Sequence, residues 1–87
     1  MSFSSSRRIA LDPQRSVGER FTAARSCAML VGQKWHARRS VVLDQVREMC
    51  GVDLLTSASE ADLPRAIAVL VAMKARGLGT SLGTPEQ

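Results

Sequence analysis

The chain has 87 residues, two cysteines and a net charge of +4. This length allows one domain, in which about 60% of the unfolded chain's surface can be buried. Two cysteines exclude a disulfide-stabilised scaffold, and 45% hydrophobic residues with 23% charged residues argue against a disordered chain. The longest wholly apolar run, residues 66–73, is far below the ~20 residues that span a bilayer, so we expect no membrane partner.

Charge divides the chain into a basic first half and an acidic middle. Eight arginines and lysines fall in residues 1–40, whereas residues 41–62 hold Arg47 against five acidic residues. A basic half can bind phosphates or an acidic protein surface, and it can also serve ordinary solubility. The distribution leaves these alternatives open.

Residues 1–15 show no sustained apolar periodicity and are expected to form a flexible, basic tail, from which Ile9 and Leu11 could reach the core. This start lacks the apolar core of a secretory signal. It is rich in Ser and Arg, as transit peptides are, but a frayed tail is the preferred interpretation. We expect Cys27 and Cys50 to be buried free thiols, which favours a reducing compartment and a cytoplasmic protein.

Residues 16–77 are expected to form a helical domain. Ser16 and Glu19 have the spacing of a capping box, and apolar residues then recur every three or four positions, which predicts a helix from Val17 to Val31. Gly32 is a natural stop for this helix.

The second expected helix begins near Trp35 or Ala37. It ends at Cys50, because Gly51 suits the left-handed position that follows a helix.

The third expected helix begins at Asp62 or Leu63, since proline at position 64 is tolerated only in a first turn. A start at Ser57 or Ser59 is the alternative. This helix is expected to end at Arg76, before a flexible tail over residues 78–87. The fold class is therefore all-α, a small bundle of three main helices with disordered termini.

The segment from Gly51 to Asp62 could be read as the turn of a DNA-binding helix-turn-helix. About a dozen residues separate the two helices, whereas that motif uses a turn of about 3–4 residues. The sequence AIAVLVAM of the following helix offers almost no group that could hydrogen-bond a base edge. We therefore interpret the segment as a structural joint.

Residues 66–73 are all apolar, although a helix on the surface of a small domain normally has a polar back. Either the alanines form a harmless exposed face, or Val69, Ala72 and Met73 pack on a partner or on a second copy of the chain.

The segment KWHARR, residues 34–39, is the best candidate site. Its residues Lys34, Trp35, His36, Arg38 and Arg39 could receive a carboxylate or phosphate between two helices, while the indole stacks on a base or fills a partner's pocket. Alternatively, the tryptophan anchors the core and the cations are simply solvated.

The sequence VLDQVREMCGVDLLTSASEADLPRAIAVLVAMKARG, residues 42–77, resembles the helical C-terminal modules of lambda-type single-strand annealing proteins. Phage antirepressor C-terminal modules share its pattern of a helix, a glycine with a hydrophobic residue, a loop, Leu-Pro and a second helix. The chain lacks the large nucleic-acid-binding region that normally precedes such a module, so it would be a free-standing relative. The resemblance implies binding of partner proteins around DNA, not catalysis.

Catalytic chemistry has little support in the sequence, and we expect no enzyme activity, no cofactor and no metal. His36 is the only histidine, and no cysteine or carboxylate lies at a recognisable ligand spacing from it. A pairing of this histidine with one of the two cysteines would need the fold to bring them together.

Three functions remain open. The preferred one is a protein-binding accessory or regulatory module of phage or mobile-element origin that acts on a host or phage nucleoprotein complex. The second is direct, non-specific nucleic-acid binding, and the third is a small structural oligomer. The residues that would carry nucleic-acid binding are Arg7, Arg8, Arg15, Arg20, Arg25, Lys34, Arg38 and Arg39.

Overall fold

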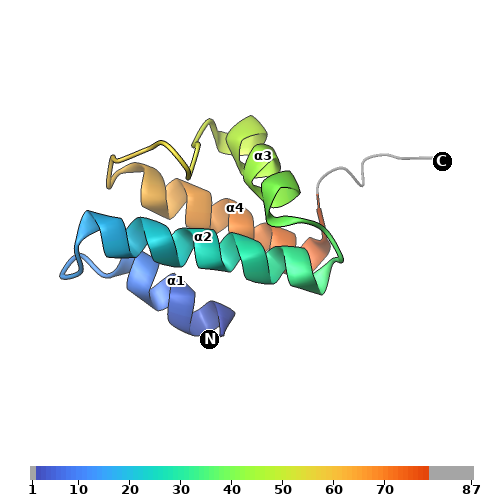
Figure 1. The fold of residues 1–87 in the computed structure, drawn as a ribbon, viewed down its shortest axis with the longest axis horizontal. Helices are drawn as coiled ribbons and strands as arrows, with labels where there is room; N and C mark the ends of the chain where they lie inside the picture. Colours follow the sequence, from blue (N-terminus) through green and yellow to red (C-terminus); the bar gives the residue numbers. More distant parts are fainter. Residues whose placement is uncertain (1, 79–87) are drawn as a thin grey trace.

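The computed structural model describes residues 2–78, and they form an all-helical fold. Its four helices are α1 (Phe3–Leu11), α2 (Val17–Lys34), α3 (Arg39–Cys50) and α4 (Asp62–Arg76) (Figure 1). The all-α prediction is confirmed, but the count of three main helices is one short because α1 was expected to be a tail.

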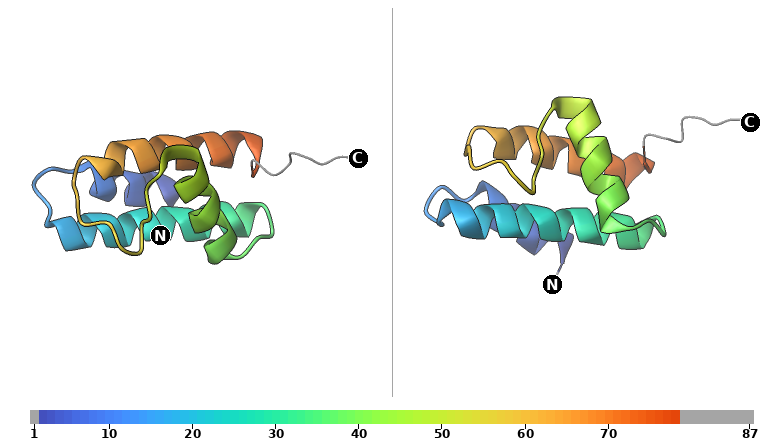
Figure 2. Two further views of the ribbon diagram at one scale, coloured as in Figure 1. Left: turned by 90° about the horizontal axis from the view of Figure 1, so that it is seen from above. Right: turned by 45° about the horizontal axis from the view of Figure 1, so that its top comes forward.

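Helices α2 and α4 form the centre of the bundle. They lie side by side and run in the same direction, with α1 antiparallel to both on one face and α3 crossing on the opposite face (Figures 1 and 2). The C-terminal ends of α2 and α4 therefore meet at one end of the molecule, whereas the N-terminus of α1 lies beside the middle of α2 (Figure 1). The end where α2 and α4 finish combines two partially negative helix termini.

Helix α1 corrects the expectation of a flexible tail over residues 1–15. The Ser2 hydroxyl accepts a hydrogen bond from the Ser5 amide at 3.1 Å, which caps the helix. Phe3, Ser6 and Ala10 follow at helical spacing and are buried. This narrow face docks α1 onto α2 and α4.

Helix α2 begins as predicted, with Ser16 and Glu19 forming a capping box. The hydrogen bonds from the backbone and hydroxyl of Ser16 lower the pKa of the Glu19 carboxyl. The helix does not stop at Gly32 but continues to Lys34.

The chain leaves α2 through a tight turn that needs a glycine inside the helix. The Ala37 amide donates to the Gly32 carbonyl at 2.8 Å, and His36 takes a left-handed conformation with φ 57°. This return brings the Ala37 carbonyl oxygen within 2.6 Å of where a Cβ on Gly32 would lie. Gly32 therefore permits close approach of the chain, and His36 occupies the position that ends the helix.

Helix α3 begins at Arg39, later than the expected start near Trp35 or Ala37, because the turn after α2 occupies those residues. Its end at Cys50 is as predicted, and Gly51 has the expected left-handed conformation, with φ 79°.

Helix α4 has the predicted bounds. Asp62 accepts a hydrogen bond from the Ser57 hydroxyl at 2.6 Å and another from Arg65 at 2.6 Å. These two bonds, the first being the stronger influence, lower the pKa of the Asp62 carboxyl. Pro64 lies in the first turn, where its missing amide costs nothing.

The loop before α4 is a structural joint, as expected from its length. Val52 and Leu54 are each 1% exposed and enter the core from this loop. The Arg25 guanidinium donates to the Leu54 carbonyl at 3.0 Å and so ties the loop to α2.

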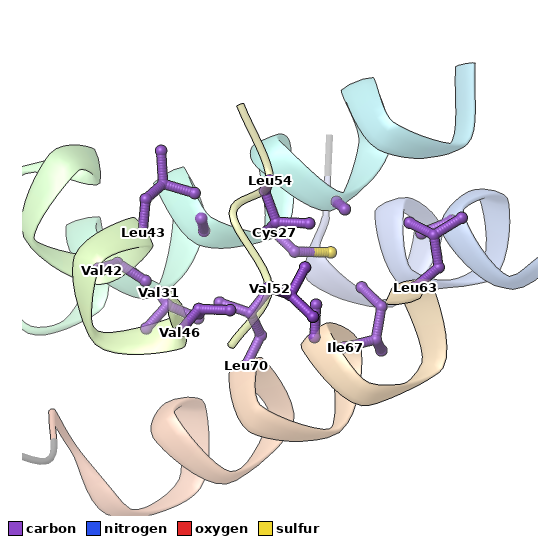
Figure 3. Packing of buried hydrophobic residues seen from close by; sticks show 14 of the residues in the cluster. Cys27, Val31, Val42, Leu43, Val46, Val52, Leu54, Leu63, Ile67 and Leu70 are labelled. Atoms are coloured by element: carbon purple, nitrogen blue, oxygen red, sulfur yellow. The ribbon is translucent and has the colours of Figure 1, made fainter. Parts of the chain in front are cut away.

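The core fills the space between all four helices and the α3–α4 loop (Figure 3). Its largest fully buried apolar side chains are Leu54, Leu63, Leu70, Met73, Val31, Val42, Val46 and Val52. Cys27 is buried as expected, while Cys50 is half-buried. Of the tail expected over residues 78–87, Leu78 packs against the core, and residues 79–87 lie outside the described part of the chain. Between residues 2 and 78, no helix is both long and apolar enough to cross a membrane.

Candidate functional site

Lys34 and Trp35, two of the expected partner-binding residues, hold the end of α4. The Trp35 indole Nε1 donates to the Met73 carbonyl at 2.9 Å, and the Lys34 ammonium donates to the Lys74 carbonyl at 2.7 Å. The last carbonyls of a helix lack partners within the helix and carry partial negative charge, so both contacts stabilise α4. Trp35 nevertheless remains 38% exposed. The residue therefore anchors α4 and still presents part of its ring to solvent.

The other residues of the KWHARR segment lie apart from this contact. His36 is exposed in the turn between α2 and α3. Arg38 and Arg39 are exposed at the start of α3, and Arg38 makes no side-chain hydrogen bond to cap that helix. The segment is thus divided between the end of α4 and the start of α3.

The apolar run of α4 is mostly used within the fold. Met73, expected to contact a partner, is 2% exposed, so its side chain lies in the core and is not available on the surface. Val69 and Ala72 are half-buried, and Ala68 is exposed. Part of the second apolar face is covered by α1, the helix that the sequence had not predicted.

Four of the eight arginines and lysines assigned to nucleic-acid binding have partners within the fold: Lys34, described above, and Arg15, Arg20 and Arg25. Arg20 is 5% exposed, donates Nε to the Ala10 carbonyl at 2.9 Å and pairs with Glu60 at 2.5 Å, so burial removes it from any phosphate-binding surface. Arg25 is engaged with the α3–α4 loop, and Arg15 forms ion pairs with neighbouring carboxylates. Arg7 and Arg8 are exposed on α1.

The structure brings together three cations that the sequence kept apart. Arg7 of α1, Lys34 of α2 and Lys74 of α4 line one hollow of about 230 Å³, together with Phe3 and Val71. The Lys74 ammonium lies 4.9 Å from the centroid of the Phe3 ring. The Lys34 ammonium lies 5.1 Å from the centroid of the Trp35 indole. Aromatic faces attract cations, so these contacts favour fixed positions for both ammonium groups.

An apolar hollow of about 390 Å³ continues from this basic end along the seam between α1 and α4. The two hollows share Arg7 and Val71, and we call them together the α1–α4 groove. The residues that line the apolar part are Arg7, Leu11, Pro64, Ile67, Ala68 and Val71.

Sequence reasoning missed this groove because one of its walls is α1. A signal was present in the four-residue spacing of Arg7 and Leu11, which places both side chains on one face if residues 3–11 are helical. The spacing of Pro64, Ala68 and Val71 likewise marks a single face of α4. Only the packing of the two helices shows that these faces meet.

The two cysteine thiols of the described residues have different surroundings. Burial raises the pKa of the Cys27 thiol to about 11, an effect that the charge of Arg7 partly offsets, so this thiol is protonated near neutral pH. The Cys50 thiol donates to the Val46 carbonyl at 3.2 Å within its own helix. Across residues 2–78, no three His, Cys, Asp or Glu side chains gather where they could hold a metal ion.

Comparisons with protein-family models, with curated proteins and with solved structures find no match to this chain.

Proposed function

We propose that this protein is a small, non-catalytic protein-binding module and that its binding surface is the α1–α4 groove. One observation carries the proposal: Arg7, Lys34 and Lys74 converge from three helices beside an apolar floor that continues along the seam between α1 and α4. A charged end next to an apolar floor is the form of a groove that receives a segment of another protein.

A protein suits this surface better than an extended nucleic acid. Arg15, Arg20 and Arg25 form ion pairs or hydrogen bonds with other residues of the protein. Fewer cations are therefore left to bind a phosphate backbone. The phosphate backbone of a duplex binds proteins through electrostatic contacts, so it offers no apolar group that could cover the apolar floor. Leu11, 39% exposed at the apolar end, would remain in water if phosphates alone were bound.

The biological setting belongs to the same proposal. The resemblance of residues 42–77 to phage helical modules favours a phage or mobile-element accessory protein that acts on a nucleoprotein complex in the cytoplasm. Self-association through the half-buried Val69 and Ala72 is compatible with this role and is not required by it.

The proposal is tested by capturing partners with groove variants. The immobilised protein is exposed to lysate of the cells that encode it, and bound proteins are identified by mass spectrometry. We expect wild type to capture a discrete partner and a Leu11→Glu/Ala68→Glu variant to lose it, because two carboxylates would then lie on the apolar floor. Val41→Glu/Met49→Glu on α3, where the side chains are 41% and 57% exposed, is the matched control and should retain the partner.

Two results would contradict protein binding through the groove. One is equal capture by wild type and by the groove variant, with both shown by circular dichroism to be folded. The other is tight binding of duplex or single-stranded oligonucleotides that weakens steeply with salt, with a log–log slope of about −4 or steeper on duplex DNA. An Arg38→Ala/Arg39→Ala variant that lost such binding would assign the function to nucleic acid instead.

A further inference from the structure

Charge in the α1–α4 groove has one sign. Its two hollows are lined by Arg7, Lys34 and Lys74, and no acidic side chain lines them among the described residues. The salt bridges formed within residues 2–78 involve none of these three cations. A ligand that brings carboxylates would therefore gain charge-assisted hydrogen bonds without breaking ion pairs of the free protein.

The cations are also held in place before any ligand arrives. The Lys34 ammonium is fixed by its bond to the Lys74 carbonyl, and the Lys74 ammonium lies over the Phe3 ring. Side chains that are already ordered lose less conformational freedom on binding. The basic end is thus suited to recognise a carboxylate at a defined position.

The shape of the groove indicates a helix as the ligand. Helix α1 forms one wall over nine residues, a length of about 13 Å at 1.5 Å per residue, which matches two to three turns of a bound helix. Ala68 is exposed on the floor, and its small side chain permits close approach of a second helix. A helical ligand would meet this floor with apolar residues three or four positions apart.

The direction of the ligand follows from electrostatics. The basic end carries three full positive charges, and Lys34 and Trp35 already bind the last carbonyls of α4, so this end attracts the carboxylates of a ligand. In a helix, carboxylates are common in the first turn, because the helix N-terminus is partially positive. A ligand whose acidic residues precede its apolar residues would place its carboxylates at the basic end of the groove and its apolar side chains on the apolar floor.

Resting on the proposed function, we infer that the occupant of the α1–α4 groove is a short acidic helix of a partner protein. Its first turn carries at least two carboxylates, which pair with Arg7, Lys34 and Lys74. Its next turns carry two apolar side chains spaced by three or four residues, which cover Leu11, Ala68 and Val71.

A displayed library of random 12-residue peptides tests this inference directly. Peptides are selected on the wild-type protein and counter-selected on the Leu11→Glu/Ala68→Glu variant. We expect the enriched peptides to carry at least two Asp or Glu residues, followed by two apolar residues at the stated spacing. Enrichment of neutral or basic peptides, or no enrichment above an empty support, would overturn the inference.

The most enriched peptide is then synthesised with a fluorophore and titrated by anisotropy. Arg7→Glu/Lys74→Glu should weaken its binding by at least tenfold, and raising the salt from 50 to 500 mM should weaken binding to wild type. Arg38→Glu/Arg39→Glu at the start of α3 carries the same total charge change away from the groove and should change the affinity by less than threefold. Equal effects at the two sites would show that net charge alone controls binding, which overturns the inference.

The two tests fail in distinguishable ways. If a partner is captured through the groove but the selected peptides are not acidic, the occupant's chemistry is wrong and protein binding stands. If acidic peptides selected on wild type without the counter-selection bind equally well to the Leu11→Glu/Ala68→Glu variant, the groove itself is wrong and both proposals fall.

Discussion

The Ser6 hydroxyl illustrates how one side chain limits the stability of a small domain. Ser6 lies on the docked face of α1 and is fully buried, and within the described structure its Oγ has no hydrogen-bond partner. A buried polar group without a partner costs about 1–3 kcal/mol. The free energy of unfolding of a small domain is of the order of 5 kcal/mol, so this single atom is significant.

Ser6→Ala should therefore raise the stability of the protein. We expect the free energy of unfolding to increase by about 1 kcal/mol relative to Ser4→Ala, measured by urea denaturation. Ser4 is exposed on the same helix. The Ser4→Ala control therefore reports the gain in helix propensity from Ser to Ala, without the removal of a buried hydroxyl. Equal effects of both substitutions would mean that the Ser6 hydroxyl is satisfied in solution.

At the scale of elements, α1 depends on docking more than on its own sequence. Its nine residues include three serines, and isolated helices of this length are unstable in water. Docking buries Phe3 and Ala10 and covers Cys27, whose thiol points toward the Phe3 carbonyl with an Sγ–O distance of 3.9 Å. Access to Cys27 therefore reports whether α1 is in place.

Phe3→Ala should release α1 and expose this thiol. In a Cys50→Ala background, we expect the labelling rate of Cys27 by an aromatic disulfide at pH 8 to rise at least tenfold, since truncating a buried Phe costs about 3–5 kcal/mol. The pKa of about 11 keeps the reaction slow in the docked state. Arg8→Ala, at an exposed position of the same helix outside the groove, is the control and should change the rate little. A high rate in both the control and wild type would mean that residues 3–11 are not docked.

The helices differ in how far sequence could predict them. Helix α4 was predicted at its bounds because Asp62, Pro64 and Gly77 mark its ends in the sequence, and α2 was predicted at its start by the capping box. The end of α2 was missed because Gly32 resembles a residue that ends a helix. Its actual role, to let the chain return closely at Ala37, is visible only in the folded structure. Helix α1 was missed because its apolar face is narrow and gains its stability from α2 and α4.

At the scale of the whole molecule, Arg20 joins three distant segments. Its guanidinium donates to the Ala10 carbonyl at the end of α1, pairs with Glu60 before α4, and extends from α2. The planar guanidinium can donate to both acceptors at once. The ammonium of a lysine is compact and more strongly hydrated, so it cannot donate to both with the same geometry.

Arg20→Lys should consequently destabilise the fold although it conserves charge. We expect a loss of about 1–3 kcal/mol in the free energy of unfolding, from the buried hydrogen bond and ion pair. Arg15→Lys, whose side chain is 46% exposed, should cost less than about 0.5 kcal/mol. Chemical denaturation of the two variants measures the difference, and equal losses would show that the contacts of Arg20 contribute little.

Of the residues that line the α1–α4 groove, only Arg7 and Lys34 were predicted from the sequence as site candidates, and they were not placed together. Arg7 was named as a possible phosphate-binding residue, and Lys34 as part of a basic junction with Trp35. Their meeting with Lys74 depends on the parallel arrangement of α2 and α4 and on the docking of α1, which no local pattern in the sequence determines. The same packing placed Arg20 and Met73 inside the fold, where local charge and periodicity had suggested the surface.

The two walls of the α1–α4 groove come from the first and the last helix of the described chain, and this has a thermodynamic consequence. A molecule that occupies the groove touches both helices, so it binds the docked form and not a form in which α1 has detached. Occupancy must then stabilise the protein by mass action, by about 2.7 kcal/mol at a free ligand concentration one hundred times the dissociation constant. The melting temperature itself thus becomes a titratable signal of occupancy, and a screen for the natural partner needs neither an activity nor a label.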